Sequence, residues 1–233
     1  MRQVLSDLGD VLLLRISGDR IRGLGWKHFA LGLVLTWIVG IGRWYDDPDA
    51  VLAQQLGAGS VGYIFVISLL ICWLGGPFAT AREIPWTYPR VLTYVSLTAL
   101  PGIVYAFPIE WVASASVSRY YNLSALALVS AWRVAMLVRL YRDGAGMKPT
   151  QTAATTLFLI SGIVLVLSFA RVLNAVASAM GGFREEGERL AADLAVGACM
   201  ISIGVLVVSG ISYWYLCATR YRGWPWTGRS RRL

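Results

Sequence analysis

Charged residues are scarce in this sequence of 233 residues, of which Asp, Glu, Lys and Arg together make up 15%. A soluble domain has about a quarter of its residues charged, so the composition excludes an ordinary soluble protein. With three cysteines and one histidine, a disulfide scaffold and a Cys/His zinc site are also excluded. GxSxG, HExxH, GxxxxGK[ST] and a GxGxxG motif after a strand are absent, and these mark the usual hydrolases, zinc proteases and nucleotide-binding proteins. We therefore expect no enzyme, no metal and no cofactor.

Hydrophobic residues, in contrast, make up 57% of the chain, and the mean hydropathy is +0.60. A hydrocarbon core of about 30 Å is crossed by roughly 20 mostly apolar helical residues. We predict an all-α fold, a polytopic bundle of about six transmembrane helices, near residues 29–42, 56–74, 91–109, 123–141, 153–172 and 194–216. Pro101 and Pro108 predict a kink in the third span.

Lysine and arginine are concentrated before the first predicted span, after the fourth and in the C-terminal tail. Because cytoplasmic segments carry an excess of these residues, both termini are predicted to be cytoplasmic, in a prokaryotic plasma (inner) membrane. The net charge of +8 is explained by this rule and by anionic lipid headgroups. We therefore expect the lipid bilayer as a partner and no nucleic acid.

Three regions follow from this pattern: a cytoplasmic N-terminal segment (residues 1–27), a six-span membrane domain (28–217) and a basic cytoplasmic tail (218–233). In the first region apolar residues recur at helical spacing, at Val4, Leu5, Leu8, Val11 and Leu12. Such an amphipathic helix either lies in the plane of the membrane or packs on the bundle, and the pattern fits both equally.

Arg133 falls in the middle of the fourth predicted span. A charge at that depth is costly and generally faces the bundle interior, a water-filled cavity or a counter-ion. Glu110 and Asp193 are the best candidates for an acidic partner, although both fall near the outer ends of their spans. A shift of the helix by one turn would instead let Arg133 snorkel to the cytoplasmic face. We favour a structural role for Arg133 over a role in transport.

Other polar groups have simpler interpretations. His28, beside Lys27 at the entrance to the first span, has no obvious partner in the sequence and is interpreted as an interfacial anchor. An acidic run after that span, at residues 46–49, contains a proline and is interpreted as a solvated turn rather than a cation site. Small residues recur in the second and sixth spans, where they let helices approach closely.

Two segments together resemble a known family. Residues Tyr88 to Pro101 begin with Tyr-Pro-Arg and continue into a span with an internal proline. Residues Ala131 to Tyr141 begin with Ala-Trp-Arg and are followed by a glycine turn at Gly144 to Gly146 and a polar entry at Lys148 to Thr152. This pattern resembles the third and fourth spans of the Yip family of small polytopic proteins, best known as Rab-interacting factors in membrane traffic. The resemblance implies a membrane organiser or adaptor and carries over no site residues. The family usually has five spans.

The sequence thus favours an integral membrane protein that binds other membrane components, as an adaptor, an assembly factor or an accessory subunit. Its expected partners are other membrane proteins or further copies of itself. The alternative is a small transporter or channel in which Arg133 lines a polar cavity. A lipid-modifying enzyme is the weakest hypothesis, since only Asp46, Asp47 and Glu110 could supply its acids.

Overall fold

The computed structural model describes residues 2–44, 52–79, 86–106, 109, 114–169 and 186–221. Within these ranges the chain forms helices joined by turns, without a strand, so the predicted all-α class is confirmed for them. The elements in chain order are α1 (Arg2–Leu12), α2 (Gly18–Arg22), α3 (Trp26–Trp44), α4 (Leu52–Gln55), α5 (Ala58–Gly75), α6 (Tyr88–Leu97), the 3₁₀-helix η1 (Leu100–Ala106), α7 (Ala115–Arg139), the π-helical turn η3 (Leu140–Gly144), α8 (Pro149–Phe169) and α10 (Glu186–Tyr221).

Four stretches of helix in the described part of the chain are long and apolar enough to cross a membrane, namely Ala58–Gly75, Tyr120–Gly144, Pro149–Ser168 and Gly197–Arg220. They coincide with the second, fourth, fifth and sixth predicted spans. The first predicted span falls on α3, whose apolar stretch (Trp26–Gly42) is shorter. A helical bundle compatible with a membrane is therefore present, whereas the number of six spans stays a prediction.

The third predicted span is broken. Helix α6 ends at Leu97, and the chain continues from Leu100 as the 3₁₀-helix η1. Pro101 has no N–H for the carbonyl of Leu97, and the N–H of Gly102 bonds to Ala99 at 2.9 Å instead of to Thr98. The predicted kink is thus a change of helix type, and Pro108 lies outside the described residues.

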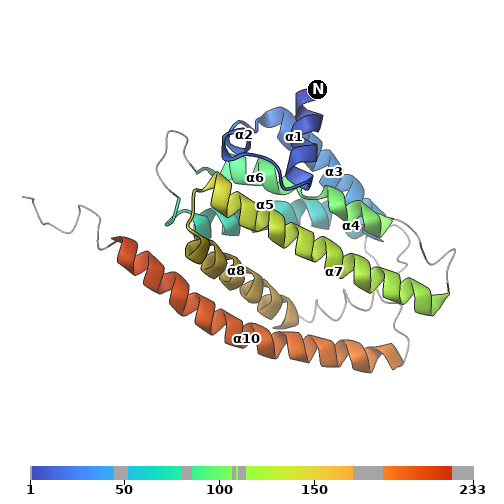
Figure 1. The fold of residues 1–233 in the computed structure, drawn as a ribbon. Coiled ribbons are helices and arrows are strands. Elements are labelled where there is room, and N and C mark those ends of the chain that lie inside the picture. The colour runs from blue at the N-terminus through green and yellow to red at the C-terminus, as the bar shows by residue number, and fades with distance from the viewer. Residues whose placement is uncertain are drawn as a thin grey trace, which may run out of the picture.

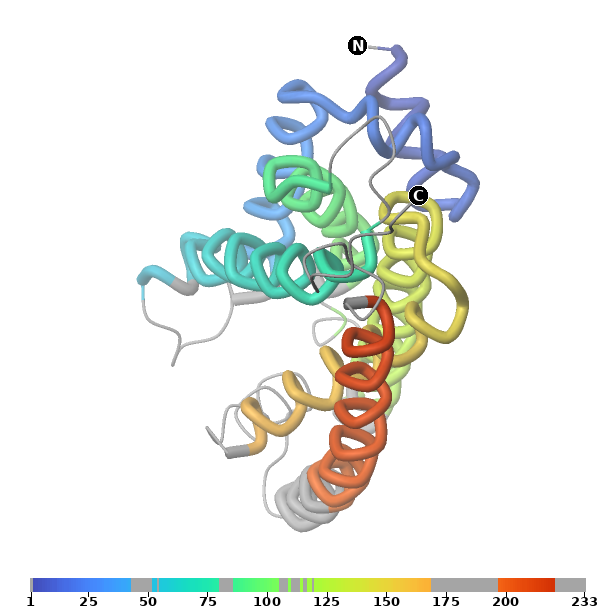
Figure 2. Tube along the Cα trace, turned by 90° about the vertical axis from the view of Figure 1, so that its left-hand side faces the viewer, coloured from blue at the N-terminus to red at the C-terminus, as the bar shows by residue number. Residues whose placement is uncertain are grey.

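Figures 1 and 2 show how the helices are arranged. Helix α10 is long and curved and lies along α8, while α3, α5 and α6 pack together on the other side of the molecule. Helix α7 passes between these two groups and contacts η1 at one side and α8 at the other. The small helices α1 and α2 lie over α6 and the C-terminal end of α7, which is the end that η3 closes (Figure 1).

One hydrophobic core connects these parts, and tyrosines cross it. The hydroxyl of Tyr94 donates to the carbonyl of Met136 at 3.1 Å, and that of Tyr213 in α10 donates to the carbonyl of Leu74 at 3.1 Å. Tyr141, fully buried, donates to a carbonyl of α5 at 3.4 Å. The hydroxyl of a buried tyrosine usually has a hydrogen-bond partner, and these carbonyls provide one for each of the three tyrosines.

The N-terminal helix is part of this core. Val4, Leu8 and Val11 on α1 are buried, and Ile16 in the following turn is 0% exposed. Of the two arrangements considered for the amphipathic helix, these contacts match packing on the bundle. The position of α1 relative to a membrane plane stays a prediction, and so does the boundary between the N-terminal segment and the membrane domain at residue 27.

Candidate functional site

Arg133 lies half-buried on α7, opposite the break between α6 and η1. Its Nε donates to the carbonyl oxygen of Thr98 at 3.3 Å. That carbonyl is the one that Gly102 leaves without its helical donor, so Arg133 supplies the missing hydrogen bond. A backbone carbonyl that a helix break leaves without its donor is thus satisfied by a side chain of a neighbouring helix.

The acidic partners expected for Arg133 are not placed by the structure. Glu110 lies outside the described residues. Asp193 falls within α10, in a stretch whose side chains are not described. The contact that is described for Arg133 is with a backbone carbonyl, which sequence reasoning did not consider because it depends on where α6 breaks.

We predict that Arg133→Ala lowers the free energy of unfolding by about 1.5 kcal/mol, because the carbonyl of Thr98 loses its donor. Arg133→Gln is expected to recover most of this loss, since the glutamine Nε2 is the same number of bonds from the backbone as the arginine Nε. Denaturant unfolding in detergent would measure both values. Equal losses in the two variants would mean that the charge matters and the bond to Thr98 does not.

A second polar group of residues, which we call the N-terminal clamp, consists of Asp7, Arg20 and His28. Asp7 is buried, with 5% of its side chain exposed. Its Oδ1 accepts from the Nε of Arg20 at 2.8 Å and also from the Nη2, while its Oδ2 lies 2.9 Å from the Nε2 of His28. The clamp thereby joins α1, α2 and α3. The expectation that His28 has no partner was wrong, because Asp7 contacts it from 21 residues away in the chain.

The hydrogen bonds of His28 define its chemistry. Its Nδ1 accepts from the backbone N–H of Gly25 at 3.2 Å, so the Nε2 carries the hydrogen that Asp7 accepts. A general base needs a free lone pair that faces a substrate, and both ring nitrogens here are engaged. The clamp is therefore a structural contact in this state.

The contribution of Arg20 to the stability of the clamp does not change with pH near neutrality. The hydrogen bond that Arg20 donates to the Asp7 carboxylate raises the pKa of the Arg20 guanidinium above its ordinary value. A raised folded-state pKa means that the contribution to stability is complete below the unfolded pKa and is lost only as the pH rises through the arginine range.

Helix α7 also secures the end of α1. The Nε1 of Trp132 donates to the carbonyl of Leu12 at 2.8 Å. The guanidinium of Arg139 donates to the carbonyl of Leu14 at 3.0 and 2.6 Å. Leu14 has a φ of 57°, which is unusual for a residue other than glycine. Two contacts from α7 thus support the strained turn between α1 and α2.

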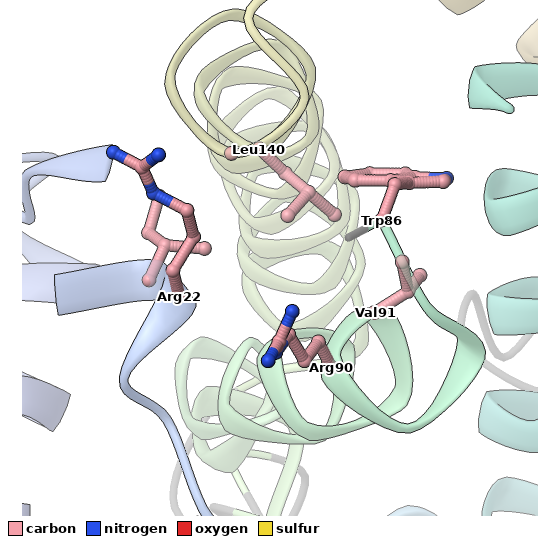
Figure 3. Close-up of a pocket in the computed structure, with 7 residues that line it drawn as sticks. Arg22, Trp86, Arg90, Val91 and Leu140 are labelled. Atoms are coloured by element: carbon pink, nitrogen blue, oxygen red, sulfur yellow. The ribbon is translucent and has the colours of Figure 1, made fainter. Parts of the chain in front are cut away.

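A small cavity of about 20 Å³ lies between α2, the start of α6 and η3. Figure 3 shows Arg22 on one side of it, Trp86 and Val91 on the other, and Leu140 between them, with the Arg90 side chain rising from α6. Trp86 is held there because its Nε1 donates to the carbonyl of Cys72 at 3.0 Å.

Arg22, Arg90 and Trp86 are not recognisable from the sequence as members of one site. Basic and aromatic residues at helix ends are ordinary interfacial anchors, so no sequence signal separates these three from the others.

Among the described residues, no group of three His, Cys, Asp and Glu side chains could hold a metal ion. Comparison of the chain with protein-family models, with curated proteins and with solved structures found no match.

Proposed function

We propose that the chain is an integral membrane protein that acts by binding other membrane components, as an adaptor, an assembly factor or an accessory subunit of a membrane complex. The observation that carries this proposal is the outward face of α10. At Gly197 and Gly204 an added Cβ would meet nothing within 4 Å. Between and beyond these glycines, Ile201, Val208 and Ile211 are 67–69% exposed.

Glycine lowers helix stability by about 1 kcal/mol relative to alanine, so its use in a helix is justified where something approaches closely. At some other helical glycines such a neighbour is present, although Gly59 and Gly62 on α5 have none among the described residues. A Cβ at Gly32 would lie 2.7 Å from the Cβ of Ser96, and one at Gly40 would lie 2.8 Å from the Cβ of Ser60. Gly197 and Gly204 have no such neighbour in the described chain. A helix of another membrane protein, or of a second copy, would fill the same role there.

The resemblance to the Yip family supports the same proposal, since it implies an organiser or adaptor. The cytoplasmic orientation of both termini and the prokaryotic plasma membrane belong to the proposal as well. Orientation is supported by the distribution of lysine and arginine along the chain.

We expect Gly204→Leu to reduce recovery of the partner about tenfold, which corresponds to the loss of roughly 1.4 kcal/mol of helix contact. The tagged chain would be purified from its native membrane in mild detergent, and the proteins that accompany it would be quantified by mass spectrometry. Gly62→Leu is the matched control, because it makes the same substitution at a glycine of α5, where an added Cβ also meets nothing within 4 Å, away from the α10 face. Unchanged recovery with Gly204→Leu would argue against this face as the docking surface.

The alternative, a small transporter or channel, is favoured by one observation, the broken helix opposite Arg133. Half-helices that meet near mid-membrane bind solutes in transporters. The described cavity, however, lies at the α2, α6 and η3 end, and Arg133 is absent from its lining. Ion leak through vesicles containing the wild type and Arg133→Gln, followed with a voltage-sensitive dye, tests this alternative. A leak that disappears in the folded variant would favour a channel.

A further inference from the structure

The turn that ends helix α1 lies beside the middle of helix α7. The Nε1 of Trp132 donates to the carbonyl of Leu12 at 2.8 Å. Trp132 falls in the middle of the apolar stretch Tyr120–Gly144, about 18 Å from either end at the usual rise of an α-helix. A hydrocarbon core is about 30 Å thick. In a membrane that α7 crosses, Trp132 therefore lies within hydrocarbon, and the end of α1 lies beside it.

The polar backbone groups of this turn are bonded within the protein. The N–H groups of Leu13 and Leu14 donate to carbonyls of α1 at 2.9 and 3.1 Å. The carbonyl of Leu12 accepts from Trp132, and that of Leu14 accepts from the guanidinium of Arg139 at 3.0 and 2.6 Å. Water can bind the last carbonyls of a helix that ends in solvent, whereas in hydrocarbon only protein donors can do so. These bonds suit the turn to an environment without water.

The side chains of the turn continue an apolar surface of α7. Leu13 is 56% exposed. On α7, Trp132 is 37% exposed, and Leu128, one turn away on the same face, is 59% exposed. Because Trp132 contacts the turn, these exposed side chains form one apolar surface that extends from α7 onto the end of α1.

Polarity changes along α1 from one end to the other. Figure 1 shows the N-terminus of α1 pointing away from α7, while its last turn lies next to α7. Arg2 and Gln3 at the far end are exposed, whereas residues 11–14 are all apolar. A polar end away from the spans and an apolar end beside one of them are the pattern expected of a helix that enters a membrane obliquely.

Two charged residues lie close to the turn. The carboxylate of Asp10 pairs with Arg20, and Arg15 is exposed. Pairing lowers the cost of a charge near hydrocarbon, and the long stem of an arginine lets its guanidinium reach the headgroups. Neither residue therefore prevents insertion of the apolar turn.

We propose that the turn at residues 12–14 is inserted among the acyl chains of the bilayer beside α7, with Leu13 as its main lipid contact and Arg2 on the water side. Helix α1 thus packs on the bundle through one face and contacts lipid through its last turn. The inference rests on the part of the proposed function that places the chain in a membrane, and it does not depend on a protein partner.

The test measures the surroundings of single spin labels on the full chain in phospholipid bilayers. The three native cysteines are replaced with alanine, and the label is attached to Leu13→Cys, Gln3→Cys or Leu157→Cys. For each label, the collision rate with oxygen, which enters hydrocarbon, is divided by the collision rate with a hydrated nickel complex, which does not. Leu157, 48% exposed on the apolar helix α8, is the reference for lipid contact, and Gln3 is the matched control on α1.

We expect the ratio at Leu13 to match that at Leu157 and to exceed that at Gln3 about tenfold or more, because hydrocarbon excludes a polar solute. A ratio at Leu13 no higher than at Gln3 would overturn the inference, and a high ratio at Leu157 would then leave the membrane location intact. Low collision rates with both agents at Leu13 would show that protein covers the turn, which would also overturn it. A low ratio at Leu157 would contradict the membrane location and the proposed function as well.

A second measurement replaces the spin label if the cysteine-free chain does not fold. A photoreactive diazirine analogue of leucine is incorporated at position 13 of the native chain, which is reconstituted in the same bilayers and irradiated. Lipid adducts at this position, identified by mass spectrometry, would support the inference. Adducts with water or with protein alone would overturn it.

Discussion

Gly32→Ala is expected to lower the free energy of unfolding by about 2 kcal/mol, the typical cost of overpacking a close contact. Gly32 lies on α3 directly against α6. An added Cβ would lie 2.1 Å from the Oγ of Ser96 and 2.8 Å from its backbone carbonyl carbon. The hydroxyl could rotate away, but the backbone carbon cannot, so the two helices must separate. Chemical unfolding in detergent, followed by tryptophan fluorescence, would measure the change.

The control for this experiment is Gly62→Ala, which makes the same substitution inside helix α5. At Gly62 an added Cβ meets nothing within 4 Å. We expect this variant to be stabilised by up to about 1 kcal/mol, because alanine has the higher helix propensity. The two substitutions should therefore have opposite signs. A stabilised Gly32→Ala would show that α3 and α6 are further apart than described.

The same close approach also supports a buried polar contact. The hydroxyl of Thr36 donates to the carbonyl of Gly32 at 2.8 Å and lies 3.4 Å from the carbonyl of Ser96. Separation of the helices would lengthen the second contact. Part of the expected loss therefore comes from a polar group that is left less well satisfied.

Asp7→Asn is expected to release the N-terminal clamp and to cost about 3 kcal/mol, as is usual when one partner of a buried charged group is removed. The carboxylate accepts hydrogen bonds on both oxygens, from Arg20 and from His28. An asparagine of the same shape must turn its NH₂ group toward one of these donors. His28 cannot adapt by moving its hydrogen to Nδ1, because that nitrogen accepts from Gly25.

The measurement for this variant is hydrogen exchange resolved along the chain. Residues 2–24 should exchange faster in Asp7→Asn, while exchange in α8 and α10 stays as in the wild type. Asp10→Asn is the control, since the Asp10 carboxylate pairs with Arg20 and its side chain is 27% exposed, so its effect should be a small fraction of that of Asp7→Asn. If both variants exchange alike, the contact of Asp7 with His28 contributes little.

Much of the fold could be predicted from the chain because it depends on local pattern. Apolar runs of the length that a bilayer demands predicted four helices that the structure contains. The missing N–H of Pro101 predicted a kink in the third span, where the structure changes from α-helix to 3₁₀-helix. The spacing of Val4, Leu5, Leu8, Val11 and Leu12 predicted one apolar face of α1. Val4, Leu8 and Val11 are buried, whereas Leu5 is 53% exposed.

The same pattern could not say what those faces contact. In-plane and packed arrangements of α1 use the same apolar residues, so composition alone does not separate them. The identity of the second surface decides between them, and the described contacts of α1 with that surface are with α3 and with Trp132 of α7.

The partners of the polar residues were likewise decided by tertiary structure. His28 and Asp7 are 21 residues apart in the chain, and Arg133 and Thr98 are 35 apart. Such contacts depend on how whole helices dock against one another and at what depth. Local periodicity contains no information on either. For Arg133 the decisive fact was which carbonyl the break in α6 leaves free.

The sequence by itself thus determined that the chain is helical, apolar enough for a membrane and irregular near Pro101, because each of these properties depends on neighbouring residues. Only the tertiary structure decided which glycines lie between helices, which polar groups meet and where a cavity remains. Those properties depend on the distance between surfaces that the chain brings together after its helices have formed.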